Sequence, residues 1–288
     1  MPLKRLLAKV GLWSDEPEHP LPDPDGPFPE AWRDILRRRV WIYERLDDDG
    51  RERLERWVLG FLWNIPFEGC SGLEITDEMR VTVAGWASLL VLNREGAKYP
   101  YLHRILIYPD GYRISEGGFF FPEQDTGFDA AGESWEEGYV ILSWRDVIGP
   151  DETDEADEAL KEQAEIPPTD ENGTPEGEPF AVGYNVVLHE LAHQLDLESG
   201  EVDGNPVLGS VERKRWDRVL ERDFARFLKA LEEGRGSAID DYGAEDPVEF
   251  FAVATETFFE NPLALQQELP DLYELLEDFY GFELVEPS

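Results

Sequence analysis

A helical pattern that carries two histidines one turn apart constrains this chain more than any other feature. The segment 184–195 reads YNVVLHELAHQL. Its apolar residues at 184, 187, 188, 191 and 195 follow the i, i+3, i+4, i+7, i+11 spacing of a helix packed on a core. Gly200 stands where a left-handed residue would end such a helix. The fold therefore has to bury this helix while keeping both histidines on one face.

His189 and His193 are four residues apart, so both imidazoles project from one face and can share a metal ion. Glu190 follows the first histidine and points toward the place of a metal-bound water. This H-E-x-x-H spacing is typical of sites in which two histidines bind zinc and the glutamate is the general base. The alternative is a pair of surface histidines, but two of the chain's four histidines fall in this pattern. We expect one zinc ion per chain here.

Two histidines leave a catalytic zinc site incomplete, because such sites have three protein ligands and one position for water. The metzincin continuation is excluded, since Asp196 and Ser199 stand in place of its glycine and third histidine. His19 lies in a proline-rich linker and His103 precedes a predicted strand, so neither suits the third position. A carboxylate from a later helix is left, as in thermolysin-type sites.

The segment 246–259 is the most apolar predicted helix of the C-terminal half. Asp246 suits the N-cap and Pro247 the first helical position. Glu249 and Glu256 share one stripe of this helix, and buried carboxylates are unfavourable unless they are paired or metal-bound. We expect one to be a ligand and the other to orient a histidine. A capping box with Asp246 is the alternative for Glu249.

The rest of the sequence predicts an α+β protein that is mainly helical with a small β-sheet. The expected helices are an αα-hairpin over 31–46 and 54–62, with a turn at 47–50, and a third helix over 77–92 capped by Thr76. Short β-branched and aromatic runs predict strands at 104–108 and 138–144. The second strand is a candidate edge for pairing with an extended substrate. After residue 180 the chain is expected to be mainly helical.

Two segments are predicted to have no core of their own. Residues 14–30 hold six prolines among acids, which indicates a stiff, solvated linker. Residues 151–178 hold twelve Asp and Glu and one Lys, which indicates an acidic surface loop. A Ca²⁺ site there is the alternative, but the spacing matches no EF-hand loop. We expect a tail and linker over 1–30 and a single metallopeptidase domain over 31–288, with a helical and β part (31–150), an acidic loop (151–180) and an active-site helical part (181–288).

Composition restricts the partners. The chain has 26 Lys and Arg against 64 Asp and Glu, a net charge of −38, so its surface repels phosphates and nucleic acid is not expected to bind. No apolar run reaches the roughly 18 residues that span a bilayer. Lys9 interrupts the N-terminal apolar stretch, so we expect neither a signal peptide nor a membrane contact, and a cytoplasmic protein. The single Cys70 excludes a cysteine-rich zinc site. The acidity indicates adaptation to high salt or a lineage bias.

Three motifs in this order resemble the Mlc titration factor A family of zinc peptidases. They are GLEITDEM at 72–79, NVVLHELAHQLD at 185–196 and EFFAVATE at 249–256. The resemblance extends from about residue 32 to residue 280. That family in turn resembles the catalytic domain of anthrax lethal factor, a gluzincin. The resemblance implies a zincin-like (gluzincin) fold and a zinc-dependent peptidase, which we expect to be aminopeptidase-like.

The resemblance also implies roles for individual residues. It implies zinc ligands at His189, His193 and Glu249, with Glu190 as the general base. It further implies a catalytic tyrosine seven residues before the glutamate ligand, where Tyr242 stands. The alternative for Tyr242 is a turn residue that packs its ring on the core.

Two further acids are candidates for orienting a ligand histidine. With Glu249 as the ligand that the resemblance implies, Glu256 becomes such a partner. Asp196, one turn past His193, could also accept a hydrogen bond from a ligand histidine, and a solvated helix acid is its alternative.

The competing class of function is a regulatory binding protein. The resemblance implies that an enterobacterial relative sequesters a sugar-regulon repressor, so the zinc fold could serve as a scaffold for a transcriptional regulator. A pure scaffold needs neither the base Glu190 nor Tyr242, and both are present. We therefore expect a peptidase with a peptide or protein substrate, and keep the scaffold as the alternative.

Overall fold

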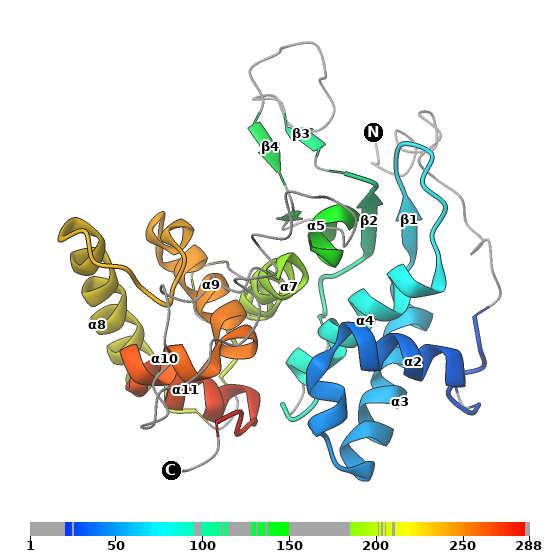
Figure 1. Cartoon of the computed structure of the whole chain (residues 1–288), viewed down its shortest axis with the longest axis horizontal. Coiled ribbons are helices and arrows are strands. Elements are labelled where there is room, and N and C mark those ends of the chain that lie inside the picture. Colours follow the sequence, from blue (N-terminus) through cyan, green and yellow to red (C-terminus); the bar gives the residue numbers. More distant parts are fainter. Residues whose placement is uncertain are drawn as a thin grey trace, which may run out of the picture. The chain divides into compact units, whose positions relative to one another are not determined.

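The computed structural model describes most of the chain, and its described residues are 21–24, 26–94, 99–110, 112–114, 128–130, 132–135, 138–149, 185–200, 202, 204, 206–208 and 211–285. The chain divides into two compact units, one of residues 1–92 and 101–147 and one of residues 93–100 and 148–288 (Figure 1). The acidic segment 151–178 and residues 14–20 and 25 of the linker lie outside the described residues. The predicted character of the acidic segment and the predicted single domain over 31–288 stay predictions. For the linker, the expectation of no core is wrong at Phe28, which is buried and has its ring centroid 5.7 Å from that of Trp32.

In its described residues up to Leu92, the first unit has three α-helices and a 3₁₀-helix. They are α2 (Glu30–Arg39), η1 (Trp41–Arg45), α3 (Asp48–Asn64) and α4 (Asp77–Val91). The predicted cap of α4 is confirmed, because Thr76 accepts a hydrogen bond from the Met79 N–H. The predicted turn at 47–50 is wrong in extent. Asp47 accepts from the Gly50 N–H and caps α3, so residues 48–50 form the first helical turn.

Helix α4 is the centre of this unit's core, since every residue from Met79 to Val91 is buried. Helices α2 and α3 pack against it. The contact with α2 is close at Gly85, where an added Cβ would lie 2.7 Å from Leu36 Cδ2 and 2.9 Å from Val40 Cγ2. Glycine at this position therefore sets the distance between the two helices.

The strands of the first unit form one four-stranded sheet and one antiparallel pair. The sheet strands are β1 (Phe67–Gly69), β2 (Arg104–Tyr108), β5 (Gly132–Trp135) and β6 (Tyr139–Ser143), and the pair is β3 (Tyr112–Ile114) with β4 (Phe128–Ala130). The sheet order is β1-β2-β6-β5, with β5 antiparallel to β6 and the other neighbours parallel. The short helix α5 (Trp144–Ile148) follows β6.

The expectation that strand 138–144 forms an edge is wrong. Strand β6 pairs with β2 on one side and with β5 on the other. Its central residues Val140, Ile141 and Leu142 are all buried, as an unbroken apolar run in an inner strand should be.

The second unit is helical in its described residues. Its elements are α7 (Val186–Asp196), η3 (Leu197–Ser199), α8 (Arg213–Glu232), η4 (Asp241–Ala244), α9 (Pro247–Glu260), α10 (Pro262–Glu268) and α11 (Pro270–Tyr280). The last three helices each begin on a proline, whose fixed φ and missing N–H suit that position. The expected left-handed Gly200 is confirmed at φ 95°, one 3₁₀ turn after α7.

Helix α9 lies at the centre of the second unit, with α7, α8, α10 and α11 packed around it. Its core side is aromatic: Phe250, Phe251, Phe258 and Phe259 are fully buried. The Trp216 ring of α8 lies 5.7 Å from Phe251 and 4.9 Å from Phe279, measured between ring centroids. This packing holds α9 firmly and leaves one of its stripes facing α7.

The predicted α+β class with a small sheet is confirmed, and the gluzincin assignment stays a prediction. Among the described residues, every helix is too short or too polar to cross a lipid bilayer.

Candidate metal centre

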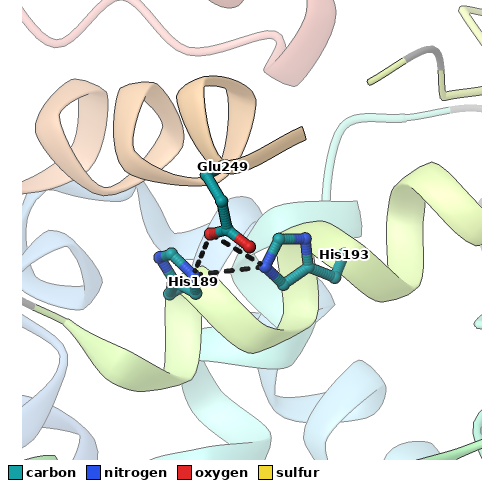
Figure 2. A group of neighbouring side chains, drawn as sticks. All are labelled: His189, His193 and Glu249. Atoms are coloured by element: carbon teal, nitrogen blue, oxygen red, sulfur yellow. Dashed lines mark hydrogen bonds and ion pairs between the residues drawn. The ribbon is translucent and has the colours of Figure 1, made fainter. Parts of the chain in front are cut away.

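His189 and His193 of α7 and Glu249 of α9 meet at one point (Figure 2). Glu249 Oε2 lies 3.0 Å from His189 Nε2 and 3.5 Å from His193 Nε2. The two Nε2 atoms are 3.2 Å apart. All three donor atoms lie within 4.8 Å of one another, and within the described part of the chain this is the one such group of three. Figure 2 shows the carboxylate reaching from α9 onto both rings.

The predicted amphipathic helix positions the histidines. Leu188, Leu191 and Leu195 are fully buried, so the apolar side of α7 packs as expected, while Tyr184 lies outside the described residues. The i, i+4 spacing places the two imidazole centroids 4.8 Å apart with the rings at 81°. Two nitrogens therefore face the same point.

The start of α9 positions Glu249. Asp246 Oδ1 accepts hydrogen bonds from the backbone N–H groups of Val248 (2.8 Å) and Glu249 (3.0 Å), which confirms the predicted cap. Pro247 occupies the first turn, also as predicted. Because Glu249 Oε2 lies beside the two imidazoles, the geometry does not favour the capping-box alternative for this side chain.

Glu256 lies on the other side of the His189 ring. Its Oε1 is 2.7 Å from His189 Nδ1, and its Oε2 accepts a hydrogen bond of 2.7 Å from the Asn185 backbone N–H. The residue is buried. A carboxylate on Nδ1 fixes the orientation of the ring and leaves Nε2 directed at Glu249 and His193.

The charges of the site favour a cation. Burial lowers the pKa of His189, but Glu249 and Glu256 outweigh it and raise that pKa to about 10. Burial raises the pKa of Glu249, but the two neighbouring imidazoles outweigh it and lower that pKa to about 2. A metal ion therefore competes with a proton for His189 Nε2, the nitrogen that faces Glu249.

The donor set fits a metal ion. Two imidazole nitrogens and one carboxylate oxygen are ligands that zinc prefers. Glu249 Oε2 is buried, and among the described residues it receives no well-directed hydrogen bond despite its short distance to His189 Nε2. A cation bound between the three side chains would satisfy this buried oxygen.

Glu190 is buried on the same helix, next to His189. Burial raises the pKa of its carboxyl to about 7, with His189 and His193 acting in the opposite direction and the other two carboxylates adding to the rise. A carboxyl group with a pKa near neutrality can both accept and release a proton.

Tyr242 lies in η4, the turn that precedes α9, where its backbone N–H donates to Asp240 Oδ1 at 2.9 Å. Its ring centroid lies 5.7 Å from that of His189. The residue is 48% exposed, so the alternative that its ring packs on the core is wrong. Partial burial and the nearby Glu249 raise the pKa of its hydroxyl, which therefore stays protonated and able to donate.

Asp196 is fully buried, so the alternative of a solvated helix acid is wrong. Its Oδ2 accepts a hydrogen bond of 2.6 Å from the Gly204 N–H. Gly204 has a φ of 74°, and an added Cβ there would lie 3.1 Å from the Pro247 carbonyl oxygen. Asp196 thus holds the chain that follows α7 close to the start of α9.

Two residues beside the site, Asn185 and Glu260, were not predicted from the sequence. Asn185 caps α7 through Oδ1, which accepts from the Leu188 N–H, and its Nδ2 donates to Glu260 Oε1 at 2.7 Å. An asparagine immediately before a predicted helix was a signal for the cap. Nothing local in the sequence signals the second contact, because the two residues are 75 positions apart.

A buried ion pair, also missed, supports the turn after α7. Arg94 and Glu198 lie 3.0 Å apart with only 6% of each side chain exposed. The Arg94 guanidinium also donates to the Val207 carbonyl and lies 4.2 Å from the centroid of the Phe279 ring. These contacts tie the segment after η3 to the C-terminal helix.

Comparison with known proteins adds three findings. The chain matches the family model described as glucose-regulated metallo-peptidase M90 over residues 23–165 and 169–281. The uncharacterized protein slr2042 of a Synechocystis species is 35% identical over 89% of this chain and 86% of its own length. Mlc titration factor A of Pectobacterium atrosepticum is 28% identical over 87% of this chain and 85% of its own length, and that of Escherichia fergusonii is 26% identical over 90% and 88%. These matches confirm the resemblance carried by the three motifs, and the second matched range contains all the candidate site residues.

Proposed function

The chain belongs to the glucose-regulated metallo-peptidase M90 family, and from that premise we propose that it is a zinc-dependent, aminopeptidase-like enzyme of the gluzincin type. The observation that carries the proposal is the convergence of His189, His193 and Glu249, whose donor atoms lie within 4.8 Å of one another. The buried Glu190 beside them supports hydrolysis rather than a purely structural metal.

We assign the three zinc ligands to His189, His193 and Glu249. Bound zinc would polarise the scissile carbonyl and lower the pKa of its water toward about 7. The chain's own contribution is to hold two imidazole nitrogens and one carboxylate oxygen on two helices whose contact is fixed by packing.

Glu190 takes a proton from the attacking water and delivers it to the nitrogen of the leaving amine. In the metal-free chain burial raises its pKa to about 7, and this buried setting beside the ligands supports a role in proton transfer. Tyr242 donates a hydrogen bond to the carbonyl oxygen as negative charge develops there. The half-exposed ring beside His189 supports this role, because substrate can reach the hydroxyl.

Two further carboxylates position these groups. Glu256 orients His189 through Nδ1, which is consistent with the 2.7 Å contact. For Asp196 we propose a different task from the one the sequence suggested. By binding the Gly204 N–H it holds the backbone between the histidine helix and α9.

The test of the enzyme is a chelator-reversible assay on a mixed peptide library, with Glu190→Gln alongside. We expect a chelator to abolish cleavage, zinc to restore it, and Glu190→Gln to retain zinc while kcat falls by about 10²–10⁴. The matched control is Glu55→Gln, a buried glutamate of the first unit that we expect to leave kcat unchanged. Full activity of Glu190→Gln with zinc bound would refute the base assignment.

The aminopeptidase preference is tested with the same peptides carrying free or acetylated N-termini. We expect acetylation to lower kcat/KM by roughly tenfold or more, because a site built to bind an amine discriminates against its absence. Equal cleavage of both series would identify an endopeptidase instead.

A second candidate function is supported by the name of several relatives. The proteins called Mlc titration factor A are named for a partner, Mlc. For this chain we propose, as the alternative, a scaffold that binds a transcriptional regulator and cleaves peptides only secondarily. Binding of purified Mlc that is undiminished in Glu249→Ala, together with no cleavage by the unmodified chain, would favour this function.

A further inference from the structure

Three carboxylates of α9 face the start of the histidine helix. Glu249, Glu256 and Glu260 stand at positions i, i+7 and i+11, so they share one stripe of α9. Glu249 contacts the two imidazoles, and Glu256 contacts His189 Nδ1. Glu260 lies one turn further along the stripe. The contact of Glu260 is with the Asn185 side chain, 2.7 Å away.

Besides the helical bond in which its carbonyl accepts from the His189 N–H, Asn185 makes three hydrogen bonds at the point where α7 begins. Its Oδ1 accepts from the Leu188 N–H at 3.2 Å, its backbone N–H donates to Glu256 Oε2 at 2.7 Å, and its Nδ2 donates to Glu260 Oε1 at 2.7 Å. The first bond caps α7, and the other two join that cap to α9. One residue thus fixes the end of one helix against the side of the other.

Glu256 is the link between this cap and the ring. One of its oxygens is held by the Asn185 backbone, and the other lies 2.7 Å from His189 Nδ1. If the cap moved, the carboxylate would have to follow it or release the ring. The direction of His189 Nε2 toward His193 and Glu249 therefore depends on where Asn185 sits.

From this geometry we propose that Asn185, clamped by Glu260, is a positioning residue that aims His189 at the metal. The inference rests on the proposed zinc site. It adds that Glu260, the third carboxylate of the α9 stripe, affects the metal site indirectly, through the Asn185 cap of α7. Neither residue touches a reacting atom, so their effect is on metal affinity and coordination geometry.

Two substitutions, Asn185→Asp and Glu260→Gln, test the Asn185–Glu260 hydrogen bond separately from the capping of α7. Asn185→Asp keeps an oxygen for the Leu188 N–H but replaces the donor to Glu260 with a second carboxylate oxygen, so the two acids repel. Glu260→Gln alone keeps an acceptor for the asparagine amide. In the double variant the glutamine donates to the aspartate, and the hydrogen bond is restored with its direction reversed.

The control is a second asparagine that caps a helix. Asn261 Oδ1 accepts from the Ala264 N–H at the start of α10, and Asn261→Asp makes the same chemical change one residue after Glu260. The measurements are zinc affinity by competition with a chromophoric chelator, the absorption spectrum of the cobalt(II)-substituted protein, and the melting temperature of the metal-free chain.

We expect Asn185→Asp to weaken zinc binding by about 10–100-fold and to alter the cobalt spectrum. Glu260→Gln and Asn261→Asp should stay within about threefold of the original affinity, and the double variant should recover most of the loss. A melting temperature of metal-free Asn185→Asp close to the original would show that the cap itself persists.

Unchanged zinc affinity in Asn185→Asp would overturn the inference. So would a loss that Glu260→Gln fails to rescue, because the loss would then not arise from this contact. An unmodified chain that binds no zinc would refute the proposed function, and this inference with it. The two failures are distinguishable, because when only this inference fails, the unmodified chain binds zinc and Asn185→Asp leaves its affinity unchanged.

Discussion

Two glutamates, the buried Glu55 of the first unit and the partly buried Glu249 of the second, have very different surroundings. Glu55 accepts hydrogen bonds from Arg33 Nε (2.8 Å), Arg33 Nη2 (2.8 Å) and the Tyr43 hydroxyl (2.7 Å). Glu249 instead faces two imidazole nitrogens at 3.0 and 3.5 Å. Arginine keeps its charge at all ordinary pH values, whereas an imidazolium can release its proton to solvent and bind a metal ion through the freed nitrogen.

The difference separates a structural acid from a candidate ligand. Burial raises the pKa of both carboxyls, and in both cases the neighbours outweigh burial and lower it. A lowered pKa therefore does not distinguish them. What distinguishes them is the partner: Glu55 is held by a guanidinium, which has no lone pair for a metal, and by a tyrosine hydroxyl, whereas two metal-binding imidazole nitrogens surround Glu249.

The strongest test of this contrast removes each carboxylate in turn. We expect Glu249→Ala to lose its bound zinc and all measurable peptidase activity, because one of three ligands is gone. Glu55→Ala should keep zinc and kcat but lower the free energy of unfolding by about 1–3 kcal/mol, since Arg33 and Tyr43 lose their partner. Zinc content by atomic absorption and urea unfolding measure the two effects. Zinc retained in Glu249→Ala but lost in Glu256→Ala would mean that the third ligand is Glu256.

The next test concerns the group that completes the site around Glu249. We expect Tyr242→Phe to lower kcat by about 10²–10³ with zinc content unchanged, because one hydrogen-bond donor to the developing charge is removed. The control is Tyr101→Phe, which changes another partly exposed tyrosine, in the first unit, and should leave kcat unchanged. Normal kinetics of Tyr242→Phe would leave that residue with a purely structural role.

A smaller effect is expected where a carboxylate orients a ligand without binding metal. Glu256→Ala should weaken zinc binding by about 10–100-fold, because His189 Nδ1 loses its acceptor. Glu268→Ala is the comparison, since Glu268 accepts from Ser237 and the Ala238 N–H and has no part in the proposed site. Competition with a chelator measures both affinities, and equal values would contradict the role of Glu256.

The smallest effect is on the pH dependence of folding. The pKa of Glu55 in the folded chain lies below its usual value of 4.5, because Arg33 and Tyr43 outweigh burial. Its ionised form therefore stabilises the fold above about pH 4.5, and that contribution disappears as the pH falls through the lowered pKa. We expect Glu55→Gln to be less stable by about 1 kcal/mol at pH 7, with the difference shrinking below pH 4.5. A constant difference down to pH 3 would contradict this linkage.

The local features of the site were predictable. The spacing of His189, Glu190 and His193 is a property of one helix, and the caps at Thr76 and Asp246 need only three or four residues. The prediction of a turn at 47–50 was wrong for an equally local reason. Three acids and a glycine resemble a loop, yet the side chain of Asp47 makes them the first turn of a helix.

The sequence by itself thus determined that α7 exists, that it is buried, and that its two histidines share a face. Among the 64 acids, the helical stripe singled out Glu249 and Glu256, but only the tertiary structure decided which imidazole nitrogen each of them approaches. It put β6 inside the sheet, Asp196 on Gly204, and Glu256 on the far nitrogen of His189. The physical reason is range: caps and periodicity act within one or two helical turns, whereas contacts such as Asn185 with Glu260 depend on how two helices pack 75 residues apart.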